Sequence, residues 1–143
     1  MTGWHLAHLI ALGLWGGIVL AEGVVEVIGT RSRAGAKVAA EVHHWIDLCC
    51  EAPVLLGVLL TGAVLAWTIP ETPLHWVKLA LGLFAVGVNF WCLGVVVRRH
   101  RRFEASSDAE VAAETRRVFL AIKLGLPAAS AALYLGLRLQ GWV

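Results

Sequence analysis

Two apolar stretches of this chain carry ionisable side chains that could bind a metal ion. The side chains are carboxylates and imidazoles, namely Glu22, Glu26, His43, His44, Asp47 and Glu51. An ionisable group inside a bilayer costs roughly 2.5–3.5 kcal/mol on insertion scales, so it normally has a partner and a function. Carboxylate oxygens and imidazole nitrogens together suit iron, zinc, manganese or copper. The sequence therefore predicts a transition-metal centre formed by these residues.

Helical spacing places these groups on facing surfaces. At 100° per residue, His44, Asp47 and Glu51 fall within an arc of about 60°. The first stretch carries a narrow polar seam within an arc of about 40°. That seam consists of His8, Trp15, Glu22 and Glu26. Because the two stretches are joined by a short connection, we expect antiparallel neighbours whose polar groups meet in one layer.

Two other interpretations of this layer remain open. Lys123 and Arg98 are expected at a similar depth, where either could act as a supporting charge. The carboxylates would then form a structural or proton-conducting network with these cations rather than a metal site. In the third interpretation, Glu26 and His43 only reach the lipid headgroups.

The elements that must position these residues are membrane-spanning helices. The chain has 143 residues, of which 59% are hydrophobic and only 15% charged, and its mean hydropathy is +0.75. A soluble domain would have about 25% charged residues. Apolar stretches at 4–28, 42–67, 74–97 and 118–139 each approach or exceed the roughly 20 residues needed to cross a bilayer. The sequence predicts an all-α integral membrane four-helix bundle, with residues 1–143 as a single domain.

Basic residues predict the orientation of the bundle. They gather in the connections after the first and third stretches, whereas residues 69–73 between the second and third contain no Lys or Arg. The positive-inside rule then places both termini outside and both basic connections in the cytoplasm. We expect a multi-pass protein of a bacterial-type cytoplasmic membrane, with the lipid bilayer as its partner and no binding of nucleic acid. The segment 107–110 fits a capping box, which predicts that the fourth helix begins well before the membrane.

A second histidine cluster lies towards the opposite end. His5 and His8 are spaced i, i+3 at the start of the first helix, and His75 and Lys78 have the same spacing at the start of the third. If these helices touch, His8 and His75 could ligate haem iron or copper. The alternative is that these imidazoles belong to an interfacial belt beside Trp4 and Trp76.

Several of these residues support a resemblance to known membrane proteins. His8 with Trp15-Gly16-Gly17, Pro53 with Thr61-Gly62, and the segment 74–79 resemble four-helix haem-binding protoporphyrinogen oxidases of the HemJ type and CopD-like copper-resistance proteins. The haem-binding resemblance implies His8 as an iron ligand and Lys78 as a functional lysine. The chain departs from that pattern, since its His-Trp-Val-Lys spacing is one residue longer. Glu22, Glu26 and the His43-His44 pair also have no counterpart, which favours a different metal chemistry on a related scaffold.

The functional prediction is a membrane protein holding a carboxylate/histidine metal centre in the cytoplasmic half of its bundle. If it is an enzyme, we expect an oxidoreductase acting on a lipophilic substrate that enters from the bilayer. The alternatives are a haem b oxidoreductase of the HemJ type, and a non-enzymatic ion or proton carrier or small complex subunit. Abundant Gly and Ala would also allow close contacts between copies, in a homo-oligomer.

Overall fold

The computed structural model describes residues 2–67 and 72–142. Within these ranges the chain is helical, with no β-strand. The helices are α1 (Gly3–Gly29), α2 (Arg33–Ile46), the π-helix η1 (Asp47–Glu51), α3 (Ala52–Ala66), α4 (Pro73–Arg102), the short 3₁₀-helix η2 (Phe103–Ala105) and α5 (Asp108–Leu139). This arrangement confirms the predicted all-α bundle.

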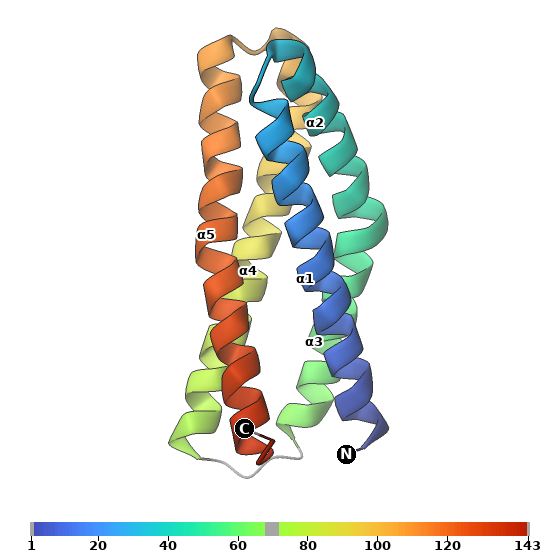
Figure 1. Ribbon diagram of the computed structural model, residues 1–143, viewed down its shortest axis with the longest axis vertical. Coiled ribbons are helices and arrows are strands. Elements are labelled where there is room, and N and C mark those ends of the chain that lie inside the picture. Colours follow the sequence, from blue (N-terminus) through green and yellow to red (C-terminus); the bar gives the residue numbers. More distant parts are fainter. Residues whose placement is uncertain (1, 68–71, 143) are drawn as a thin grey trace.

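The chain crosses the long axis of the molecule four times (Figure 1). α2, η1 and α3 follow one another without a break and together form the second crossing. Each of the four crossings is long and apolar enough to span a bilayer, and large apolar side chains such as Leu20, Leu60 and Leu83 are exposed on its surface. The molecule is therefore a multi-pass membrane protein by length and composition.

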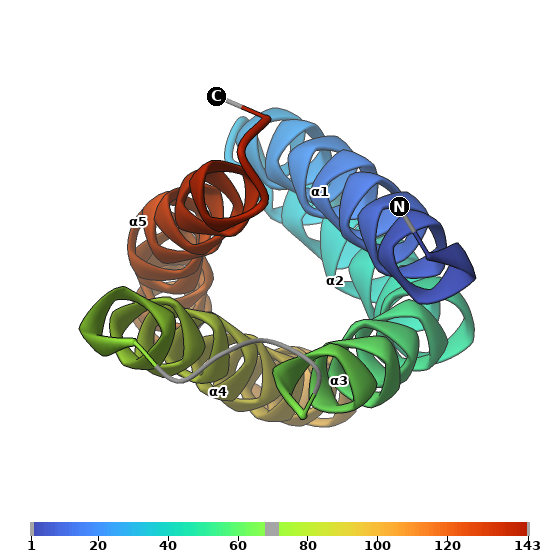
Figure 2. The same ribbon diagram turned by 90° about the horizontal axis from the view of Figure 1, so that it is seen from below.

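Both termini lie at one end of the bundle, and the two basic connections lie at the other (Figure 1). We call these the terminal end and the basic end. Seen along the axis, the four crossings surround a common centre (Figure 2). α4 and α5 pack along most of their length, whereas α1 meets α5, and α3 meets α4, over short stretches only.

Polar side chains define where the helices begin. The hydroxyls of Ser32 and Thr72 accept hydrogen bonds from the backbone N–H groups of Gly35 and His75, at 3.0 and 3.2 Å. Ser107 and Glu110 form a reciprocal capping box at the start of α5. The predicted capping box is therefore confirmed, and α5 begins ten residues before the expected apolar stretch at 118. Such caps satisfy backbone donors that have no partner within the helix.

α1 and α2 approach each other closely at the basic end. A Cβ atom at Gly29 would lie only 2.5 Å from the Cβ of Ala39, so glycine lets α1 and α2 approach closely after their short connection. Lys37 forms an ion pair with Glu104, and Arg33 pairs with Asp108. These ion pairs join the start of α2 to η2 and the start of α5.

Candidate metal centre

The buried charges cluster where α1, α2 and η1 meet, towards the basic end. Glu22 and Glu26 are one turn apart on α1, and His43 and Asp47 are one turn apart on the second crossing. Each of these four residues is at most 3% exposed. The sequence prediction that the polar groups of the first two crossings meet in one layer is borne out for these residues.

The π-helix aligns the acidic residues of the second crossing. A π-turn contains more residues than the 3.6 of an α-turn, so it rotates later side chains back towards the face they would otherwise leave. Asp47 and Glu51 begin and end this segment, and both are buried, while Cys49 and Cys50 between them are exposed. Pro53 follows directly, and because it has no N–H it cannot complete a regular α-helical ladder there.

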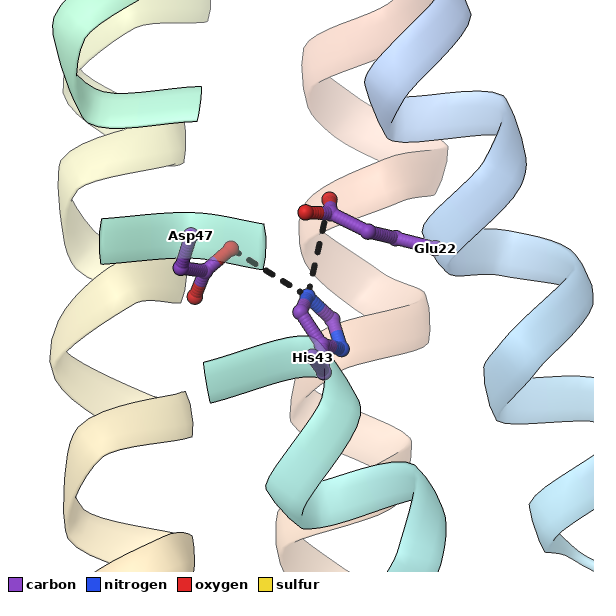
Figure 3. A group of neighbouring side chains, drawn as sticks. All are labelled: Glu22, His43 and Asp47. Carbon is purple, nitrogen blue, oxygen red and sulfur yellow. Dashed lines mark ion pairs between the residues drawn. The ribbon is translucent and has the colours of Figure 1, made fainter. Parts of the chain in front are cut away.

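Glu22, His43 and Asp47 form the core of the cluster (Figure 3). Each residue offers one ligand atom, and these atoms all lie within 4.8 Å of one another. His43 Nε2 lies 3.5 Å from Glu22 Oε2 and 3.4 Å from Asp47 Oδ1. Ligand atoms arranged in this way surround a point that a metal ion could occupy after small adjustments of the side chains. We call these three residues the triad.

Glu26 and Arg99 support the triad from outside. Arg99 of α4 donates to both carboxylate oxygens of Glu26, with Nη1 lying 2.8 Å from Oε2. Glu26 Oε1 also lies 2.6 Å from His43 Nδ1, and because a paired carboxylate only accepts, the proton belongs on Nδ1. In the neutral ring, His43 Nε2 then carries the lone pair that faces Glu22 and Asp47. A carboxylate that fixes the ring of a metal-binding histidine in this way is common in metal sites.

The triad contains buried oxygens without hydrogen-bond partners among the described residues. They are Glu22 Oε1 and both carboxylate oxygens of Asp47. The guanidinium of Arg99 is directed at Glu26 and makes no ion pair with Glu22 or Asp47. Burying an ionised carboxylate without a partner costs free energy, so a bound cation or a proton is expected at these oxygens.

A small cavity adjoins the triad. Its volume is about 120 Å³, and its polar lining includes Glu22, His43, Glu51 and Asn89. Trp15 of α1 also lines it and donates its indole N–H to Glu51 Oε1 at 2.9 Å. Glu51 is therefore a neighbour of the triad across this cavity rather than a member of it.

Three residues that the sequence assigned to this site lie elsewhere. His44 is one position, or about 100°, round the helix from His43, and its ring stacks on His100 of α4 with centroids 4.1 Å apart. Arg98 pairs with Glu114 of α5 at 3.1 Å, and Lys123 is exposed. The prediction of Lys123 or Arg98 as supporting charge is therefore wrong, because Arg99 is the cation that reaches the carboxylates.

Arg99 could have been found from the spacing of its neighbours. Cys92, Val95 and Val96 form a buried stripe on α4, and Arg99 continues that stripe one turn later. Because Arg99 lies within a run of basic residues, the sequence alone assigns its charge to the basic connection between α4 and α5. Its helical position shows instead that it faces the interior.

The second histidine cluster surrounds a larger cavity at the terminal end. This terminal-end pocket has a volume of about 480 Å³ and is lined by residues of all four crossings, including His5, His8, His75 and Lys78. His8 Nδ1 lies 2.8 Å from the hydroxyl of Thr61, which itself donates to the Gly57 carbonyl, so His8 is the donor and its Nε2 is left as an acceptor. Among the described residues, these imidazoles do not form a group of three close enough to share one ion.

Comparisons of this chain with protein-family models, curated proteins and solved structures found no match.

Proposed function

We propose that this membrane protein holds a divalent transition-metal ion between Glu22, His43 and Asp47. The observation that carries the proposal is the convergence of their three buried ligand atoms within 4.8 Å, together with carboxylate oxygens that lack partners. A divalent cation would compensate the negative charge that Arg99 leaves unbalanced. The sequence-based alternatives of Glu26 and Glu51 as direct ligands receive less support, because both carboxylates already accept hydrogen bonds.

The ligand set favours iron, manganese or zinc. Imidazole nitrogen and carboxylate oxygen are donor types that these ions accept, and three protein ligands would leave coordination positions open. The cavity of about 120 Å³ beside Glu22 and His43 would provide room for a small exogenous ligand at such a position. Glu51 lies on that cavity and could exchange a proton with a group bound there.

The proposed activity is oxidation or reduction of a lipophilic substrate. The site lies within apolar helices, and the seam between α1 and α5 is sparsely packed, which favours access from the bilayer over access from water. We further propose that the basic end faces the cytoplasm, since Arg and Lys are concentrated there. The metal centre would then lie in the cytoplasmic half of the membrane.

The experiment that tests this proposal is metal analysis of protein purified without chelators. We expect bound metal near one equivalent, and a rise in melting temperature when the matching ion is added to stripped protein. Glu22→Gln and Asp47→Asn should each lose the metal while remaining folded. The matched control is Glu41→Gln, which changes an exposed carboxylate on α2 and should keep the metal. Metal-free protein that gains no stability with iron, manganese, zinc or copper would refute the proposal.

A second candidate function is a proton-carrying ion cluster. It is favoured by the position of His43, whose two nitrogens face Glu26 on one side and Glu22 and Asp47 on the other. A proton on Nε2 would make this ring a cation among three carboxylates and would take the place of the metal. Infrared difference spectra would separate the two cases, since the proton cluster predicts carboxylate bands that respond to pH but not to added metal.

A further inference from the structure

The terminal-end pocket has the shape of a site for an elongated apolar ligand. Along α1 it extends from His5 to Trp15, a rise of about 15 Å at 1.5 Å per residue. Most of its walls are aliphatic or glycine, and a Cβ atom at Gly82 would meet no other atom within 4 Å. The cavity therefore has an apolar inner part that could hold a hydrocarbon chain.

The polar groups that line this pocket are the imidazoles of His5, His8 and His75, the ammonium group of Lys78, the amide of Gln140 and the indole N–H groups of tryptophans. Among the described residues that line it, none is acidic, while Lys78 contributes a cationic ammonium group. No carboxylate of the described residues lies within ion-pair distance of that ammonium group. His75 is 2% exposed, and its Nδ1 is buried without a hydrogen-bond partner in the described part of the chain. A half-buried lysine and an unpartnered buried imidazole together indicate that an anionic group belongs here.

The backbone of α5 leaves room for the lysine. A Cβ atom at Gly136 would lie 3.2 Å from Lys78 Cε, so glycine at this position allows the lysine stem to cross towards α5. The stem is thereby held beside the cavity rather than extended along the helix towards the interface. This placement keeps the ammonium group where a ligand headgroup could reach it.

We infer that the terminal-end pocket binds a long-chain lipid carboxylate, with its headgroup at Lys78 and His75 and its hydrocarbon chain directed towards Trp15. The charge of the lining selects a carboxylate over a neutral lipid, and the apolar inner part selects a long chain over a small acid. This inference concerns residues outside the triad and is independent of the metal proposal.

Fluorescence quenching in nanodiscs of neutral lipid tests the inference. The probes are dibromostearic acid and the dibromostearyl alcohol of the same chain length, whose bromine atoms quench nearby indole rings such as Trp15. We expect saturable quenching by the acid at lower concentration than by the alcohol. Lys78→Met should lower the affinity for the acid by about 10-fold or more, which corresponds to the loss of one charge-assisted hydrogen bond. The affinity for the alcohol should not change. Lys123→Met removes an exposed lysine of α5 and should not change the affinity for either probe.

A second pair of variants tests the apolar part without changing charge. Gly82→Leu places a side chain inside the pocket and should lower the affinity for both probes. Gly87 is exposed on the same helix and does not line the pocket, so Gly87→Leu should lower neither affinity. Equal quenching by acid and alcohol in the native protein, or unchanged quenching in both Lys78→Met and Gly82→Leu, would overturn the inference. A Soret band in the purified protein that disappears with His8→Ala would also overturn it, because a porphyrin would then occupy the pocket.

Discussion

Arg99 of α4 and Glu26 of α1 form a buried bidentate ion pair across the centre of the bundle. Their side chains are 3% and 2% exposed, respectively. The pair joins the first crossing to the third. Glu26 Oε1 also contacts His43 Nδ1, so the pair fixes the orientation of the His43 ring. One interaction therefore links the stability of the bundle to the orientation of the proposed metal ligand.

Loss of Arg99 should destabilise the protein strongly. Arg99→Met leaves Glu26 as a buried carboxylate without its partner, and breaking such a pair typically costs about 3–5 kcal/mol. The measurement is the free energy of unfolding in a mild detergent. The matched control is Arg98→Met, which affects a half-exposed pair with Glu114 and should cost about 1 kcal/mol or less. Equal losses for the two variants would contradict the assignment of Arg99 as the central cation.

Glu22→Gln and Lys123→Met distinguish a ligand from a structural charge. If Glu22 binds the metal, its amide variant should lose bound metal but keep most of its melting temperature without metal. Lys123→Met should change neither property, because Lys123 is exposed. Both quantities are measured on the same preparations. Full retention of metal in Glu22→Gln would exclude this carboxylate from the ligand set.

The haem alternative makes a separate spectroscopic prediction. A haem bound through His8 gives an intense Soret band that shifts on reduction, whereas the carboxylate-rich triad gives none. We expect no Soret band that depends on His8, and we expect metal content to depend on His43. A band abolished by His8→Ala and unaffected by His43→Gln would support the resemblance to the haem-binding oxidases over the triad.

Gly29 should tolerate no side chain. In Gly29→Ala the new Cβ would lie 2.5 Å from the Cβ of Ala39, so α1 and α2 must move apart. Overpacking of this kind costs about 1–3 kcal/mol, and it should also weaken metal binding because the same helices hold the triad. Gly17→Ala is the control, since a Cβ there meets nothing within 4 Å. Melting temperatures of the two variants that fall together would show that the α1–α2 contact is not tight.

The sequence predicted the crossings well because apolar length is a strong signal. Glu22, His43 and Asp47 could also be assigned to one layer, since a short connection forces the first two crossings to be antiparallel. The site predictions that were wrong depend on how each helix is rotated about its axis. One residue of helical rotation separates His43, which faces the carboxylates, from His44, which faces His100. A prediction that assigns residues to a helix without fixing its rotation cannot choose between them.

The π-turn needed tertiary information, whereas Arg99 did not. The pattern of charge does not separate Arg98 from Arg99, but the apolar stripe of Cys92, Val95 and Val96 points to Arg99 as the residue that faces the interior. Pro53 signals a disturbance of the second crossing, but it does not specify a π-turn at 47–51. In a regular α-helix Glu51 would already lie about 40° from Asp47, so the turn adjusts the alignment of these two carboxylates rather than choosing the face they occupy.

Trp15 lines both the small cavity beside the triad and the terminal-end pocket, and its indole N–H holds Glu51. The two sites therefore share a wall, which Leu12, Ala129 and Leu133 also line. By thermodynamic linkage, any ligand that displaces this ring from one side changes the affinity of the other side, and the effect is reciprocal and equal in both directions. Binding in the terminal-end pocket and chemistry beside the triad would then be coupled through this shared wall.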